Sequence, residues 1–131
     1  MKKKTPIENA ADSPRPEVIV DFIFNNGLLF VSVENIGDRP ALNVKVRFDE
    51  KFSGASGTNV PAMPLFQALE FLAPRKSIRT LLDASAEYFR RGEPTRITAR
   101  IAFEDTNRHK YNCVLRHNLE IYRDLAYIPE A

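Results

Sequence analysis

Apolar and polar side chains alternate most regularly in the segment Ala41-Leu42-Asn43-Val44-Lys45-Val46-Arg47-Phe48-Asp49. The apolar residues are Leu42, Val44, Val46 and Phe48. The polar residues between and after them are Asn43, Lys45, Arg47 and Asp49. A period of two residues is typical of a β-strand with one buried and one exposed face. We therefore predict an antiparallel sheet in which this strand turns its lysine and arginine to solvent.

The same alternation occurs on both sides of this stretch. Residues 96–103 and 111–121 are predicted to be long strands that bury Ile97, Ala99, Ile101 and Phe103 in the first, and Tyr111, Cys113, Leu115, His117, Leu119 and Ile121 in the second. Upstream, strands at 18–24 and 28–35 flank Asn25-Asn26-Gly27, which is typical of a tight hairpin. Another strand is predicted over 77–82. About seven short strands predict an all-β, immunoglobulin-like antiparallel β-sandwich with one or two short helical turns.

Three segments depart from the strand pattern. Residues 51–62 are rich in glycine and serine and are predicted to form a long, mobile loop. Residues 64–72 fit either a helix or a short edge strand, and both alternatives stay open. Residues 84–91 fit a helix of at most two turns, with Asp83 as its N-cap and Gly92 as its stop.

The chain of 131 residues has the length of one ordinary domain. Residues 1–16 contain three lysines and three prolines, and we predict a flexible N-terminal arm. The sandwich is predicted over 17–122 and a C-terminal tail over 123–131. The apolar side chains at the end of the chain are expected to fold back over the sandwich: Tyr122, Leu125, Tyr127 and Ile128.

Composition excludes several classes of protein. The net charge of +2 is too small for a global nucleic-acid signal. No apolar run is long enough to cross a membrane, and the basic start at Lys2 is followed by polar residues instead of the core of a signal peptide. The sequence as written therefore predicts a soluble cytoplasmic protein. An exported or anchored protein that had lost an upstream segment would have the same sequence, and that alternative stays open.

One stretch carries a family resemblance. Residues 33–46, Val33-Glu34-Asn35-Ile36-Gly37-Asp38-Arg39-Pro40-Ala41-Leu42-Asn43-Val44-Lys45-Val46, resemble the V-x-N-x-G … A-x-x-V pattern of bacterial cell-adhesion-related immunoglobulin-like domains. Phe71-Leu72-Ala73-Pro74 is similar to the Leu-Ala-Pro-Gly turn of the same domains, with Arg75 in the position of the glycine. The resemblance covers roughly residues 17–122. It implies a sandwich that serves as an accessory binding or spacer domain without catalytic residues.

The residues capable of chemistry are few and scattered. Cys113 and His117 share the buried side of the last strand, but four residues along a strand separate their backbones by about 13 Å, too far for a catalytic dyad. The turn around Asp105 and His109 offers oxygen ligands for calcium, but tight turns need the same residues, and Arg108 opposes a cation. We predict no catalytic residue, no metal site and no cofactor, and therefore no enzyme.

Charge placement is the remaining signal. In an immunoglobulin-like sandwich the third strand lies beside the last two. One sheet face would then carry five cations: Lys45, Arg47, Arg96, Arg100 and Arg116. The polar positions between them are Asn43, Thr98, Asn112 and Asn118, together with Val114, while Asp49, Glu104 and Glu120 fall towards the ends. Such a face is suited to docking an anionic partner.

We therefore predict a protein-interaction module of unknown specificity that docks an acidic partner on this face. A solvated face without a partner is the plainer interpretation. The alternatives are a structural spacer or assembly subunit, including a homo-oligomer, and a nucleic-acid-binding protein. The nucleic-acid alternative is the weaker one, because no aromatic side chain for base stacking lies among the five cations.

Overall fold

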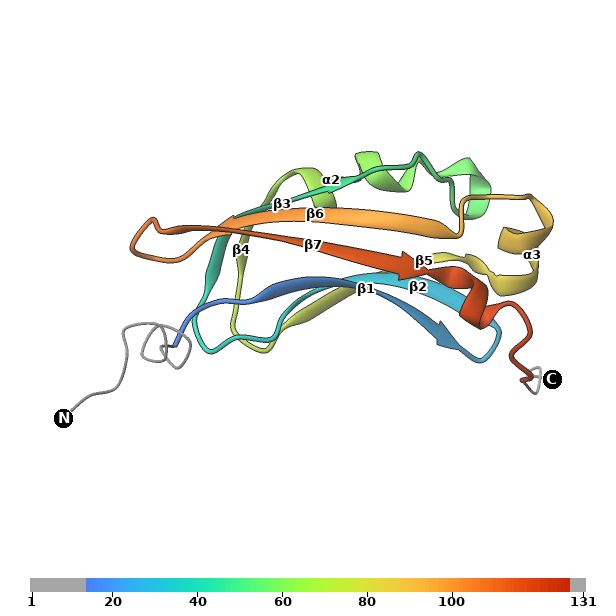
Figure 1. Ribbon diagram of the computed structural model, residues 1–131, viewed down its shortest axis with the longest axis horizontal. Coiled ribbons are helices and arrows are strands. Elements are labelled where there is room, and N and C mark those ends of the chain that lie inside the picture. Colours follow the sequence, from blue (N-terminus) through green and yellow to red (C-terminus); the bar gives the residue numbers. More distant parts are fainter. Residues whose placement is uncertain (1–13, 128–131) are drawn as a thin grey trace.

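Two antiparallel sheets face each other in the computed structural model, which describes residues 14–127 (Figure 1). The first has the strand order β1 (Val18–Asn25), β2 (Leu28–Asn35), β5 (Ser77–Ala84). The second has the order β4 (Leu69–Leu72), β3 (Ala41–Phe48), β6 (Arg96–Glu104), β7 (Lys110–Asn118). The predicted all-β sandwich is confirmed, and the third strand lies beside the last two as predicted.

The core lies between the sheets and consists of the side chains that the period of two selects. β2 contributes Leu29, Val31 and Val33, and β6 contributes Ile97, Ala99, Ile101 and Phe103. Burying one large aliphatic side chain stabilises a fold by about 1.5–3 kcal/mol, so two such rows hold the sheets together. Both rows are the ones predicted from the sequence.

A bulge in β3 corrects the predicted side-chain directions at the start of that strand. Asn43 has a φ of 52°, a left-handed conformation that asparagine tolerates better than most residues. The register with β6 shifts between Leu42 and Lys45. As a result Ala41, rather than Leu42, is fully buried. Leu42 was predicted to be a core residue but is half-buried and pairs with Glu104.

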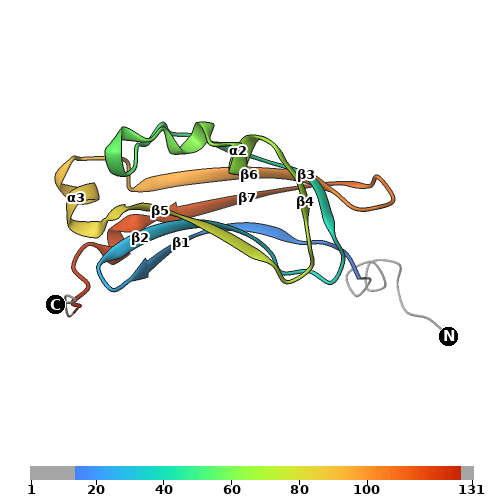
Figure 2. The ribbon, with the colours of Figure 1, turned by 180° about the vertical axis from the view of Figure 1, so that it is seen from behind.

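The segment 51–62 was predicted to be a mobile loop, and that prediction is wrong about its packing. It contains two 3₁₀ turns, η1 (Ala55–Gly57) and η2 (Val60–Ala62), and it lies along the margin of the sandwich (Figure 2). Phe52 and Val60 are buried in the core. Gly54 packs so tightly that a Cβ there would lie 2.4 Å from the carbonyl oxygen of Leu82.

The segment 64–72 contains both of the alternatives left open by the sequence. It begins with a single helical turn, α2 (Pro64–Gln67), and continues as the edge strand β4. The predicted second helix is α3 (Ser85–Arg90), and Gly92 follows its end with a φ of 72°. The predicted N-cap is wrong, because the cap residue is Ala84. The carboxylate of Asp83 instead pairs with Arg91.

The last strand is shorter than predicted. β7 ends at Asn118, whose side-chain oxygen accepts a hydrogen bond from the Glu120 amide and starts the turn η3 (Leu119–Tyr122). Ile121 was predicted to be buried and is 64% exposed. The tail folds back as predicted, because the rings of Tyr122 and Tyr127 both contact Phe24. Leu125 remains exposed, and Ile128 lies outside the described residues.

Asn35 ties three segments together at one end of the sandwich. Its side chain is completely buried. The Oδ1 atom accepts hydrogen bonds from the amides of Glu17 (3.1 Å) and Gly37 (2.9 Å). The Nδ2 atom donates to the carbonyls of Arg39 (2.8 Å) and Leu72 (3.2 Å). All four hydrogen bonds that a carboxamide can make are therefore formed within the protein.

Gly37, which is hydrogen-bonded to Asn35, packs closely against the backbone of residues 15–17. A Cβ on Gly37 would lie 2.2 Å from the carbonyl oxygen of Arg15, so no side chain fits there. The Arg15 carbonyl accepts a hydrogen bond from the Asp38 amide. Residues 1–16 were predicted to be a flexible arm. Residues 1–13 lie outside the described residues, while the Arg15 carbonyl is hydrogen-bonded and Pro16 is buried.

Candidate functional site

The five predicted cations lie together on the outer face of the four-stranded sheet. Lys45 and Arg47 project from β3, Arg96 and Arg100 from β6, and Arg116 from β7, and all five are exposed. The register aligns Arg47 with Arg100 and Arg116 with Thr98. We call the surface formed by Lys45, Arg47, Arg96, Arg100 and Arg116 the basic face.

Like charges face each other across the centre of the basic face. Arg47 lies directly opposite Arg100 on the neighbouring strand. Cross-strand pairs of this kind change stability by about 0.2–1 kcal/mol, and like charges are the unfavourable case. Within residues 14–127 the basic residues that form ion pairs are all elsewhere: Arg75, Arg90, Arg91, His109 and Arg123. None of the five cations of the basic face is neutralised by an ion pair with a described residue.

Glu104 and Glu120 lie towards the ends of the basic face, as predicted, but Asp49 lies within it, opposite Thr98 and between the levels of Arg100 and Arg96. The Asp49 carboxylate accepts a hydrogen bond of 2.8 Å from the Thr98 amide and so extends the pairing of β3 with β6. Glu104 ends β6 opposite Lys110. Glu120 lies beyond the other end, where a hydrogen bond from Arg123 is the largest of the effects that lower its pKa to about 2. The charge of Arg96 adds a smaller lowering effect.

A shallow groove crosses the basic face and has an apolar patch in it. Its lining includes Lys45, Arg47, Gln67, Arg100, Asn112 and Val114. Val114 is 40% exposed. Gln67 comes from α2, where its Nε2 atom donates to the carbonyls of Pro61 (2.8 Å) and Val46 (3.4 Å). The groove therefore combines cations and amides with the exposed aliphatic side chains of Ala102 and Val114, which suits an anionic segment with some apolar character.

Cys113 and His117, the two residues weighed as a catalytic pair, both contact the neighbouring strand β1. His117 Nε2 lies 2.9 Å from the Val20 carbonyl oxygen, and its ring meets Phe22 edge to face. The Cys113 thiol donates to the Val18 carbonyl at 3.5 Å. Burial, and to a lesser degree the charge of Glu17, raises the pKa of this thiol, which keeps it protonated. Both side chains therefore join the last strand to the carbonyl groups of β1.

The turn between β6 and β7 uses its own donors to satisfy Asp105. One carboxylate oxygen accepts the amides of Asn107 (2.8 Å) and His109 (3.0 Å), and the other lies 3.0 Å from the Tyr111 hydroxyl and 3.1 Å from the His109 ring. Burial raises the pKa of Asp105, but these hydrogen bonds outweigh it, so the pKa lies below its ordinary value. Among the described residues no cluster of three metal-ligating side chains occurs.

Two hydrogen-bonding contacts were not predicted from the sequence, one at the groove and one at the edge of β1. Gln67 reaches the groove only because α2 packs beside β3, and the ambiguous pattern of residues 64–72 contained no signal for that. Tyr122 joins Cys113 and His117 in bonding to β1, its hydroxyl donating to the Phe22 carbonyl at 2.7 Å. That contact joins residues 100 positions apart, beyond the reach of local patterns.

Comparison with known proteins identifies the family and no closer relative. A family model described as "Domain of unknown function (DUF8453)" matches residues 2–123. No curated protein and no solved structure matches the chain. No helix among the described residues has the length and apolar character needed to cross a membrane.

Proposed function

The chain belongs to the family Domain of unknown function (DUF8453), and for this member we propose a non-catalytic, immunoglobulin-like interaction module that docks an acidic protein on the basic face. The observation that carries the proposal is the opposed pair Arg47 and Arg100, neither of which forms an ion pair with a described residue. Such a pair is mildly unfavourable in the free protein. An acidic partner would turn that repulsion into attraction and raise the rate of association.

The groove favours a protein partner over a nucleic acid. Base stacking needs exposed aromatic rings among the cations, and the outward positions of β3, β6 and β7 between Lys45 and Arg116 contain none. The exposed side chain at the centre is instead the aliphatic Val114. An acidic segment that also offers an apolar side chain complements this surface better than a phosphate backbone does.

Charge reversal at the centre of the basic face tests the proposal. We expect Arg47→Glu combined with Arg100→Glu to weaken the binding of poly-L-glutamate by about tenfold or more at low salt, since like charges would then meet at the interface. The variant is expected to unfold at a denaturant concentration close to that of the wild type. Fluorescence anisotropy of labelled poly-L-glutamate, with added salt as a second variable, measures the effect.

The matched control reverses two exposed cations away from the basic face. Arg39→Glu combined with Lys76→Glu makes the same change in net charge and is expected to change affinity by less than about threefold. Equal losses in the two double variants would contradict docking at the basic face. Tighter binding of single-stranded DNA or RNA than of poly-L-glutamate would favour the nucleic-acid alternative instead.

One observation supports the alternative of a structural spacer. The described chain enters the sandwich at one end of its long axis, before β1, and leaves it at the other end, after η3 (Figure 1). That arrangement suits a module placed in line between two others. A spacer has no use for the basic face, so the same double variant separates the two functions.

A further inference from the structure

The basic face adjoins a strand edge whose backbone groups point outwards. The Leu119 amide donates to the Thr95 carbonyl (2.7 Å), and the Asp105 amide donates to the His109 carbonyl (3.0 Å). These bonds lie at the two ends of the unbroken pairing of β6 with β7, and both use odd-numbered residues on the β7 side. Hydrogen bonding alternates along an antiparallel pair, so the odd-numbered residues of β7 bond to β6 throughout.

The even-numbered residues of β7 therefore direct their N–H and C=O groups away from the sheet. In the middle of β7 these residues are Asn112, Val114 and Arg116, and their side chains belong to the outer side that carries the basic face. A free edge of this kind is a template for pairing with another strand. The outward backbone edge of β7 therefore borders the basic face, and Arg116 belongs to both.

The other strand edges of the described sandwich are shorter or covered. The edge of β1 receives side-chain hydrogen bonds at the carbonyls of Val18, Val20 and Phe22. β4 has four residues, and the edge of β5 is covered at Leu82 by the backbone of Gly54. β7 has nine residues, which makes it the longest edge without such cover among these.

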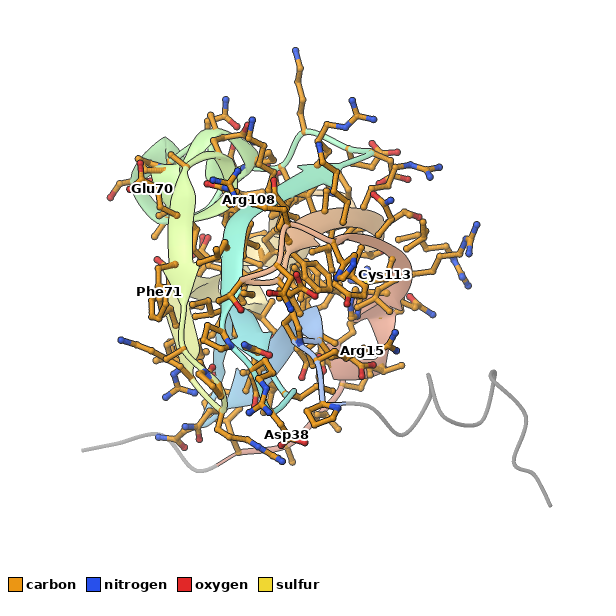
Figure 3. All side chains as sticks on the ribbon, turned by 90° about the vertical axis from the view of Figure 1, so that its left-hand side faces the viewer. Arg15, Asp38, Glu70, Phe71, Arg108 and Cys113 are labelled. Carbon is orange, nitrogen blue, oxygen red and sulfur yellow. The ribbon has the colours of Figure 1, made fainter. Side chains whose placement is uncertain are left out.

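The other side of the β7 edge opens onto an apolar groove between β7 and β1. Its lining includes Val18, Ile19, Tyr111, Cys113 and Leu115, with Arg15 at the rim beside the Tyr111 ring. Figure 3 shows Arg15 and Cys113 on this side of the sandwich and Glu70 and Phe71 of β4 on the opposite side. A strand added to β7 would place alternate side chains over the basic face and over this groove.

We propose that the partner binds as an added strand on the edge of β7, through an extended segment in which acidic and apolar residues alternate. Its acidic side chains lie over the basic face near Arg116 and Arg100, and its apolar side chains cover the groove beside Leu115. Main-chain hydrogen bonds supply affinity and the two rows of side chains supply specificity. The acidic character of the segment rests on the proposed function, whereas the pairing with β7 rests on the strand register.

Amide hydrogen exchange tests the strand addition directly. The probe is acetyl-Glu-Val-Glu-Val-Glu-Val-Glu-amide, and its control has the same composition with the valines grouped together, so that alternation is lost. Edge amides exchange readily because they lack a stable partner. We expect the alternating peptide to slow exchange at Asn112, Val114 and Arg116 by about tenfold or more, and the grouped peptide to leave it unchanged.

A proline substitution provides the test from the protein side. Val114→Pro removes one outward N–H without changing charge, and edge strands tolerate proline better than central strands do. We expect it to weaken binding of the alternating peptide at least about tenfold, while Val114→Ala changes binding by less than about threefold. Should the proline variant fail to fold, the exchange measurement on the wild-type protein decides alone.

The outcomes separate this inference from the proposed function. In one outcome the peptide does not slow exchange at Asn112, Val114 and Arg116, and Arg47→Glu with Arg100→Glu abolishes its binding. That result overturns strand addition and leaves docking on the basic face intact. Absence of saturable peptide binding at about 1 mM also overturns strand addition. If the peptide protects these amides and its affinity is unchanged by both charge reversals, strand addition is supported and the acidic partner is overturned.

Discussion

Replacing Asn35 with alanine is expected to lower the free energy of unfolding by about 3–5 kcal/mol, one of the two largest effects expected in this protein. The buried carboxamide satisfies two amides and two carbonyls, which belong to Glu17, Gly37, Arg39 and Leu72. Alanine would leave these groups without their partner, and each buried unsatisfied group costs about 1–3 kcal/mol. Urea denaturation followed by circular dichroism measures the change.

The matched control for this prediction is Asn112→Ala. Asn112 is exposed on β7, so its loss is expected to change the free energy of unfolding by less than about 0.5 kcal/mol. A cost below about 1 kcal/mol at Asn35 would show that the four hydrogen bonds do not join the segments as described.

Replacing Phe52 with alanine is expected to cost about 3–5 kcal/mol, because the substitution opens a cavity in the core. Phe52 is 2% exposed, and its ring contacts Phe22 at 6.1 Å and Phe48 at 5.1 Å between centroids. Phe48 in turn meets Phe66 at 5.1 Å, so the change reaches a cluster that joins both sheets to α2. The shift in the midpoint of chemical denaturation reports the effect.

Phe71→Ala removes the same side chain from a surface position and serves as the control. Phe71 is 57% exposed on β4, so its loss is expected to cost less than about 1 kcal/mol. If residues 51–62 were the mobile loop that their composition predicts, the two substitutions would have similar small effects. Comparable stability of the two variants would therefore contradict the packing described for Phe52.

The strands and their buried rows were predictable because burial in a sheet repeats every two residues. The row Leu29, Val31 and Val33 in β2 is visible in the sequence for that reason, and the structure buries all three. The same local pattern predicted the row of β6. Local pattern and tertiary packing agree in these elements, so nothing more was needed to find them.

The errors lie where packing between distant segments overrides local sequence. Phe52 and Val60 are isolated apolar residues among glycines and serines, so no period marked them as core. The bulge at Asn43 depends on how β3 pairs with β6, and it exchanges Leu42 for Ala41 in the core. Neither outcome can be read from alternation alone.

The basic face was predictable in part. Its five cations follow from alternation in β3, β6 and β7 together with the assumption that these strands are neighbours, which the strand order confirms. The direct opposition of Arg47 and Arg100 required the register. To know that the Val114 backbone points outwards, one must know whether the odd- or the even-numbered residues of β7 bond to β6. Only the observed hydrogen bonds at Thr95 and His109 establish this.

The most direct test of docking at the basic face is an NMR titration of ¹⁵N-labelled protein with poly-L-glutamate at low salt. We expect the largest amide shift changes to map to the strands bearing Lys45, Arg47, Arg100 and Arg116, and to disappear as salt is added. Largest changes on β1, β2 and β5, or changes spread evenly over both sheets, would contradict docking at this face.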